Sequence, residues 1–185
     1  MKYAIKHRYT GAVLYEADIP DDTPSGLQCR VALEKATQAK ADLRGCNLSG
    51  SDLRGCNLRG CNLRGSDLRD SDLRGSNLSG SNLSYSHLSD SDLRGRSLSD
   101  SDLSGAIVRG HKLIGTRPVF QIGPIGSRCA QFVSYITEAG VLLNAGCFWG
   151  TVDEFRAKLA DTHGNNDHAK EYEMALLMID AHAAI

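Results

Sequence analysis

The chain has 185 residues, enough for one domain or two small ones, and its 21 basic and 22 acidic side chains give a net charge of -1. This balance argues against a strongly basic nucleic-acid binder, and it gives no sign of an acidic DNA mimic. There is no apolar run of membrane-spanning length, the N-terminus lacks the apolar centre of a signal peptide, and six cysteines are too few for a disulfide scaffold. We therefore expect a cytoplasmic protein with no membrane partner, and we do not expect nucleic acid as a partner.

The first forty residues predict a β-hairpin followed by a helix. Strand patterns at 2–8 and 12–17 flank a short turn that contains Gly11. A helix is expected over 26–40, with Ser25 as its cap and Gln28 completing a capping box. The apolar side of that helix is expected to comprise Leu27, Val31 and Ala36. We expect the helix to cover the start of the next segment, and a helix that binds a partner is the alternative.

Residues 41–110 repeat a five-residue pattern fourteen times without a gap. Leucine holds the third place in 13 blocks and Val108 in the last, the first residue is almost always small, the second is mostly Asp or Asn, and the fifth is usually Gly. A period of five fits neither a helix nor a strand, so it predicts short extended pieces joined by turns, with leucine inside. Serines in the small place then need backbone partners inside the fold. Cysteines in the same place are expected to be small interior filler, and they are Cys46, Cys56 and Cys61.

These blocks, such as ADLRG, CNLSG and SDLRG, resemble the pentapeptide repeat family, whose blocks read A(D/N)Lxx. The resemblance implies a right-handed quadrilateral β-helix with four blocks per coil, so residues 20 apart should stack. The expected fold class is therefore mainly β. Its expected parts are an N-terminal hairpin with a helix cap at 1–40, the repeat at 41–110 and a small C-terminal α+β domain at 111–185.

The 20-residue register predicts one face with a column of aspartates beside a column of arginines. The arginines of this candidate interaction face are Arg54, Arg74 and Arg94, and the aspartates are Asp52, Asp72 and Asp92. The face is either a solvated set of salt bridges or a track for anions, because the guanidinium fork suits phosphate oxygens.

The repeat as a whole contains nine basic and nine acidic side chains and is neutral. Quinolone-resistance members of the family are thought to protect DNA gyrase by imitating the charge of a DNA duplex. A duplex carries one negative charge per about 1.7 Å, which a short neutral repeat imitates poorly. Gyrase binding is therefore disfavoured for this chain.

Two blocks depart from the pattern. Arg96 occupies an inward, small-residue place, and because a buried unpaired guanidinium is costly, we expect a local bulge there. Tyr85 replaces a turn glycine and precedes His87. A protruding patch of these three residues and a tolerated loop are both compatible with the sequence.

Beyond residue 110 the period ends and the pattern becomes that of an α+β domain. The expected elements are strands at 119–122, 132–137 and 141–145, a turn-rich link at 123–128, and helices at 152–161 and 167–183. Thr151 and Glu154 form a capping box for the first of these helices, which should end at His163-Gly164. The last helix has a wide apolar belt, which predicts burial on two sides and thus a homo-oligomer.

The string GPIGSR is a weak candidate for anion binding. It lacks the lysine of a phosphate-binding P-loop, but exposed amides beside Arg128 could hold an anion, and a plain turn is the alternative. The candidate ligand-binding residues are Gly123, Gly126, Ser127, Arg128, Lys170 and Tyr172. Cys147, His163 and His168 lack the tight spacing of a zinc site or a Cys-His nucleophile, so we expect no metal, no cofactor and no catalytic residue.

The strings GPIGSR, GCFWGT and HGNNDH, and the opening YAIKHRYTGAVLY, resemble those of some phage and prophage pentapeptide repeat proteins. We therefore expect a non-enzymatic binding protein of phage or prophage type, acting in the host cytoplasm on a protein partner that the sequence does not identify. The alternative is a binder of a small anion or nucleotide that sequesters a host immune signalling molecule, which would be a counter-defence role.

Overall fold

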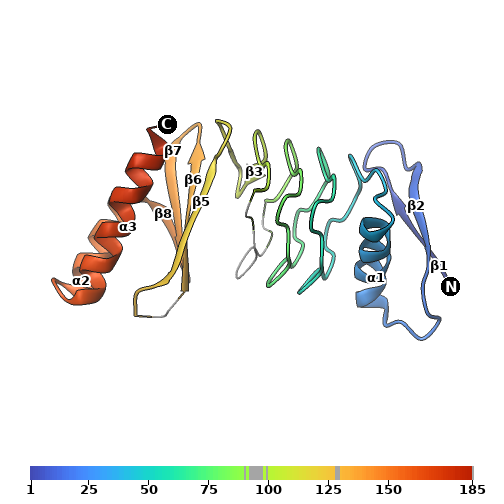
Figure 1. Cartoon of the computed structure of the whole chain (residues 1–185), viewed down its shortest axis with the longest axis horizontal. Helices are drawn as coiled ribbons and strands as arrows, with labels where there is room; N and C mark the ends of the chain where they lie inside the picture. Colours follow the sequence, from blue (N-terminus) through green and yellow to red (C-terminus); the bar gives the residue numbers. More distant parts are fainter. Residues whose placement is uncertain (90, 92–97, 99, 128–129, 185) are drawn as a thin grey trace. The chain divides into compact units, whose positions relative to one another are not determined.

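The computed structural model describes residues 1–89, 91, 98, 100–127 and 130–184. It divides the chain into two compact units, 1–112 and 113–185, so the N-terminal segment shares a unit with the repeat (Figure 1). Four residues singled out in the sequence lie outside the described residues: Asp92, Arg94, Arg96 and Arg128.

The first unit contains β1 (Lys2–Lys6), β2 (Val13–Asp18), α1 (Ser25–Gln38), β3 (Ile107–Val108) and β4 (His111–Lys112). Strands β1 and β2 form the predicted antiparallel hairpin. Just beyond β1, His7 bridges antiparallel to Cys46, and the Arg8 amide donates a 2.7 Å hydrogen bond to the Gly45 carbonyl. The hairpin thereby satisfies the first open edge of the repeat, an edge that would otherwise present unpaired backbone groups.

Helix α1 lies close to its predicted position but starts differently. Its cap position is Pro24, which has no side-chain hydrogen bond to offer, so the predicted capping box of Ser25 and Gln28 is wrong. The Gln28 amide instead donates to the Thr23 carbonyl at 3.2 Å, which ties the helix to the preceding turn.

The buried side of α1 also differs from the prediction. Leu27 and Val31 are only half-buried, whereas the buried residues are Cys29, Ala32, Leu33 and Ala36. Small side chains let the helix approach the repeat closely, and the Ser51 hydroxyl lies 3.3 Å from the sulfur of Cys29. Helix α1 therefore covers the first blocks of the repeat, as expected.

The repeat has the 20-residue register that the sequence predicts. Parallel bridges join Asp42 to Asn62, and Asn62 to Asn82, and the loops of successive turns lie side by side in Figure 1. Between turns, the Leu48 amide donates to the Asp67 carbonyl at 2.8 Å, and equivalent bonds recur along the segment. The described leucines of the repeat point inward and are buried, including Leu53, Leu63, Leu73 and Leu83, each at 0 % exposure.

Each block turns the chain with the same local bonds. Where one block passes into the next, the Ser76 amide donates to the Leu73 carbonyl, and Gly75 between them has a φ of 66°, in the left-handed region that glycine tolerates. The Ser76 hydroxyl bonds to the same carbonyl at 2.7 Å, so the interior serines do find backbone partners. Burial raises the pKa of the Cys46 thiol to about 12, which fits an unreactive filler residue.

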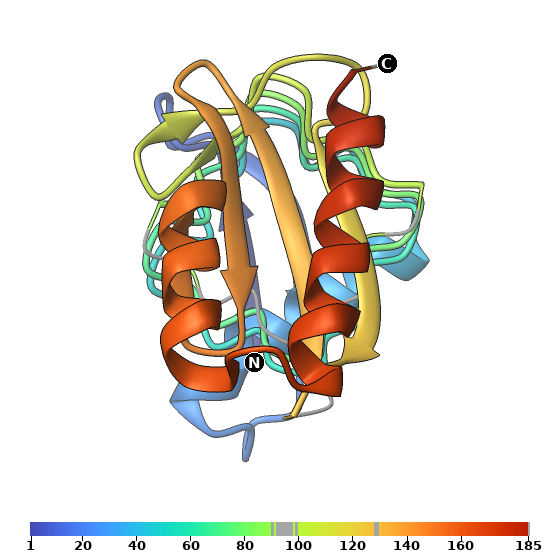
Figure 2. The same ribbon diagram turned by 90° about the vertical axis from the view of Figure 1, so that its left-hand side faces the viewer.

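The second unit contains β5 (Val119–Ile125), β6 (Ala130–Thr137), β7 (Gly140–Ala145), β8 (Phe148–Thr151), α2 (Val152–His163) and α3 (Asp167–Ala183). The strands form an antiparallel sheet in the order β5-β6-β7-β8, and both helices lie on one face of it (Figure 2). Phe132 from the sheet and Phe155 from α2 meet in the core with ring centroids 5.1 Å apart, and Leu176 and Ile179 of α3 pack there as well.

Two features of this sheet were not predicted. Strand β5 continues through Pro124 to Ile125, which pairs with the backbone of residue 130 after a shift in register, so most of the GPI segment is strand rather than turn. Strand β8 was missed, because it is only four residues long and follows directly on the turn after β7.

The two C-terminal helices begin as the sequence predicts. The Thr151 hydroxyl accepts from the Glu154 amide at 3.2 Å, while the Glu154 carboxylate accepts from the Thr151 amide at 2.8 Å, so the capping box is confirmed. Helix α2 ends at Gly164, and α3 has the predicted bounds with Asn166 as its cap. In the described part of the chain, no helix has the length and hydropathy needed to cross a bilayer.

We expect Leu63→Ala to lower the free energy of unfolding of the repeat unit by about 2–5 kcal/mol, because it removes a fully buried side chain and leaves a cavity. Denaturant unfolding followed by circular dichroism measures the loss. The control is Val13→Ala in the same unit, where the side chain is 54 % exposed and we expect a change within about 0.5 kcal/mol. Equal losses in the two variants would show that the leucine column does not form the core.

Candidate functional site

Two of the three predicted face arginines are brought together on neighbouring turns. Arg54 donates to Asp52 through Nε at 2.8 Å and Nη2 at 2.5 Å, and Arg74 holds Asp72 in the same way. Across the turns, Arg54 Nε lies 3.6 Å from Asp72 Oδ2. The four side chains therefore form a continuous ladder of alternating charge, which we call the Asp-Arg ladder.

The aspartates of this ladder are held by backbone amides in addition to the arginine side chains. Asp52 Oδ1 accepts a hydrogen bond from the Arg54 amide at 3.2 Å. An aspartate side chain can form this local turn with the amide two residues later. The hydrogen bond from the Arg54 side chain lowers the pKa of Asp52 to about 2. Because both guanidinium groups are engaged by carboxylates, the geometry favours a solvated salt-bridge face over an anion track.

The second place of each block decides whether the arginine two residues later is paired. Where that place is aspartate, the arginine is held by the carboxylate, as in Arg44 with Asp42. Where it is asparagine, the described residues give the arginine no carboxylate partner, and this is the case for Arg59 and Arg64. The sequence shows whether the second place is Asp or Asn, but the pairing of the arginine two residues later was not predicted from it.

Arg64 lies at a groove of about 580 Å³ within the first unit. The hairpin contributes His7 and Tyr9 to its lining, and the repeat contributes Gly65 and Tyr85. The sequence singled out Tyr85 as a departure from the pattern, but nothing in it placed Tyr85 and the hairpin turn at one groove.

The candidate anion site in the second unit is only partly assembled. Gly126, Ser127 and Tyr172 come together, so closely that a Cβ on Gly126 would lie 2.1 Å from the Tyr172 hydroxyl. The Gly126 amide donates to the Glu171 carboxylate at 2.8 Å, and the Lys170 ammonium bonds to Asp167 at 2.8 Å. The amide and the ammonium that were to hold an anion therefore already have acidic partners.

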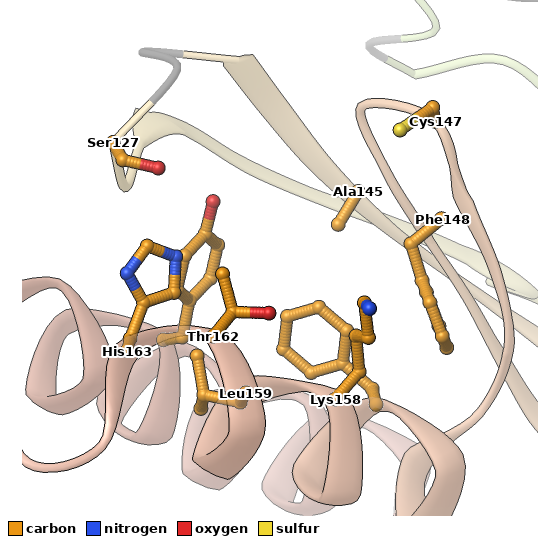
Figure 3. A pocket seen from close by; sticks show the side chains of 10 residues that line it. Ser127, Ala145, Cys147, Phe148, Lys158, Leu159, Thr162 and His163 are labelled. Carbon is orange, nitrogen blue, oxygen red and sulfur yellow. The ribbon is translucent and has the colours of Figure 1, made fainter.

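The pocket beside this segment is small and largely apolar. Its volume is about 120 Å³, and Ser127, Phe155 and Tyr172 help to line it, whereas neither Gly123 nor Lys170 does (Figure 3). Sites for drug-sized ligands usually measure about 300–1,000 Å³, so this pocket is too small for a nucleotide.

The suspected zinc or nucleophile residues do not form a constellation. Cys147 and His163 line opposite parts of the small pocket in Figure 3, and the rings of His163 and His168 lie 5.8 Å apart between centroids. Among the residues that the structure describes, no group of three His, Cys, Asp or Glu side chains is placed to hold a metal ion.

The similarity of this chain to known proteins lies in the repeat. The family model described as pentapeptide repeats matches residues 41–80 and 81–117 with eight copies, whereas curated proteins give no match. A pentapeptide repeat protein from the cyanobacterium Cyanothece 51142 is 36% identical, with 30% of this chain and 37% of that chain covered and a TM-score of 0.30.

A pentapeptide repeat protein from Nostoc PCC 7120 is 30% identical, with 43% of this chain and 80% of that chain covered and a TM-score of 0.30. QnrB1, a plasmid-mediated fluoroquinolone resistance protein, is 26% identical, with 35% and 43% covered and a TM-score of 0.23. The TM-scores are low, so the kinship rests on the repeat sequence. The fourteen blocks, their 20-residue register and the family match together show that this chain belongs to the pentapeptide repeat family.

Proposed function

We propose that the protein is a non-enzymatic binding protein of phage or prophage type, whose repeat folds as a right-handed, four-sided β-helix and presents a face to a protein partner. The observation that carries the proposal is the Asp-Arg ladder. Its side chains are held by neighbouring backbone and carboxylate groups before any partner arrives, and pre-ordered side chains lose less conformational entropy on binding.

The phage setting and the host cytoplasm are supported by the resemblance of the N-terminal and C-terminal strings. Burial raises the pKa of Cys46 and Cys61 to about 12, so these two interior thiols are poor nucleophiles.

The other two candidate roles have less support. For the anion site at residues 123–128, the described geometry gives an amide and an ammonium already paired with acidic groups. For gyrase binding, each aspartate of the Asp-Arg ladder is neutralised by an arginine, which is unlike the uncompensated charge of a duplex.

The double variant Arg54→Ser/Arg74→Ser is expected to weaken partner binding at least about 10-fold, because each arginine supplies charge-assisted bonds at the face. Serine occupies the same place in other blocks, where the Ser79 and Ser104 hydroxyls bond to the second residue, so the fold should tolerate it. Tagged wild type and variants would be used to capture host proteins, and a candidate identified by mass spectrometry would be rebound in purified form.

The matched control for this experiment is Arg59→Ser, the same substitution on a different face. The proposal requires a purified partner that binds wild type and the control equally and loses affinity for the double variant. A partner that binds all three alike, or the lack of any saturable protein partner, contradicts it.

The pKa of Asp52 tests whether the ladder has the geometry described. The folded pKa of about 2 lies below the ordinary 3.8, so this pair stabilises the fold above about pH 4, and that stability is lost as the pH falls towards 2. We expect Arg54→Ser to return the pKa of Asp52 towards 3.8, as measured by carboxyl-carbon NMR titration. Asp67, whose pKa is lowered by Arg69 in another block, should be unchanged in the same sample. An unchanged pKa for Asp52 would contradict the pairing.

We also propose that the second unit forms a homo-oligomer through the outer side of α3. One side of this helix packs on the sheet through Ala175, Leu176 and Ile179. On its outer side, Met174, Leu177 and Met178 are 68 %, 66 % and 53 % exposed. Their spacing of three and four residues makes a contiguous apolar stripe, a feature typical of a protein interface.

Met174→Glu/Leu177→Glu is expected to convert an oligomer to a monomer, because it would bury charges in the interface. Size-exclusion chromatography with light scattering measures the mass. Asp161→Lys, a charge change at an exposed position of α2, should leave the mass unchanged. A wild-type mass equal to one chain at all concentrations would refute the proposal.

A further inference from the structure

Tyr85 stands in a column of glycines. The fifth residues of four successive turns are Gly45, Gly65, Tyr85 and Gly105, and Tyr85 has a φ of 59°, in the left-handed region. A bulky side chain in this region is strained, and such strain is concentrated at functional sites. The neighbouring turn is adapted to it, since a Cβ on Gly105 would lie 2.8 Å from Cε1 of the tyrosine ring.

Arg64 lies against this ring with a charge that no described carboxylate offsets. Its guanidinium carbon is 5.1 Å from the centroid of the Tyr85 ring. Asn62 holds the second place of the block, and its side-chain oxygen accepts the Arg64 amide rather than the guanidinium. The tyrosine thus positions the arginine head while leaving its hydrogen-bond donors available to an anion.

The hairpin turn also lines this groove. The amides of Tyr9 and Thr10 both donate to Nδ1 of His7 at 3.3 Å, which holds the imidazole in place beside Gly45. Tyr9 itself is 77 % exposed, and Arg8 lies over its ring at 4.6 Å. The Arg8 guanidinium covers one face of this ring, and the other face is the one left to stack on an aromatic ligand.

The size and charge of the groove suit a small aromatic anion. Its volume of about 580 Å³ is within the range of small-molecule sites, unlike the pocket of the second unit. The carboxylate of Asp42 is held by Arg44, with Nε 2.8 Å from Oδ1, so it does not cancel the charge of Arg64. Gly45 and Gly65 line the groove without side chains and leave room between the walls.

We infer that this groove binds a nucleoside monophosphate or a closely similar aromatic phosphate, with the phosphate on Arg64 and the ring stacked on Tyr9. The guanidinium matches phosphate oxygens, and nucleobases stack on exposed aromatic rings. The site lies half a coil away in sequence from the Asp-Arg ladder, so it does not depend on the proposed protein-binding face.

Isothermal titration calorimetry of the full chain with AMP, GMP, CMP and UMP tests this inference. We expect saturable binding of at least one of them, and at least about 10-fold weaker binding by Arg64→Ser and by Tyr85→Gly. Both substitutions introduce the residue that the same column holds elsewhere, serine at 84 and 104 and glycine at 45, 65 and 105, so both variants should fold. Tyr85→Gly should also melt at or above the wild-type temperature, because it relieves the left-handed strain.

Arg59→Ser is the matched control, since Arg59 also follows an asparagine and lacks a described carboxylate partner but lies outside the groove. It should bind the nucleotide as wild type does. The nucleoside alone and inorganic phosphate alone should bind at least about 10-fold more weakly than the nucleotide, because each makes only one of the two contacts. The inference is overturned by no binding of any of the four nucleotides, by binding that survives Arg64→Ser, or by inorganic phosphate binding as tightly as the nucleotide.

Discussion

Everything in the first unit depends on the hydrogen bonds that join one turn of the repeat to the next. An amide such as that of Leu48 donates to a carbonyl 19 residues later, and this spacing fixes which residues stack. Once the register is set, the described leucines of the repeat lie inside, and fourth-place arginines such as Arg54 and Arg74 lie outside. A shift by one residue would move a charged side chain into the interior, so the sequence pattern and the backbone bonds specify the same arrangement.

The interior of the repeat could be predicted because the five-residue pattern that determines it is local and recurs in every block. Leucine burial, the interior serines and the buried thiols all follow from a five-residue pattern with a single large apolar side chain. The capping box of Thr151 was predictable for the same reason, since its two partners are three residues apart. By contrast, α1 was misjudged at its start because Pro24 takes the cap position, and its buried side was misjudged because the close approach of the repeat favours small side chains such as Ala32 there.

The candidate sites were harder to predict because they depend on contacts between distant segments. Nothing local indicates that Glu171 occupies the amide of Gly126, 45 residues away, and that one bond changes how the GPIGSR segment is interpreted. Similarly, the groove beside Tyr85 requires the hairpin turn, which lies at the other end of the unit in sequence. The sequence does place an asparagine two residues before Arg64. That asparagine becomes informative only by comparison with arginines such as Arg44, which follow an aspartate and are paired with it.

The choice between aspartate and asparagine at the second place has a consequence for how such a protein can diversify. Both residues accept the same backbone amide two positions later, as Asp52 and Asn62 show, so exchanging them leaves the turn intact. What changes is whether the neighbouring guanidinium is occupied. Because a single nucleotide change interconverts the two codons, each block of the repeat can gain or lose an available cation without a change in its turn.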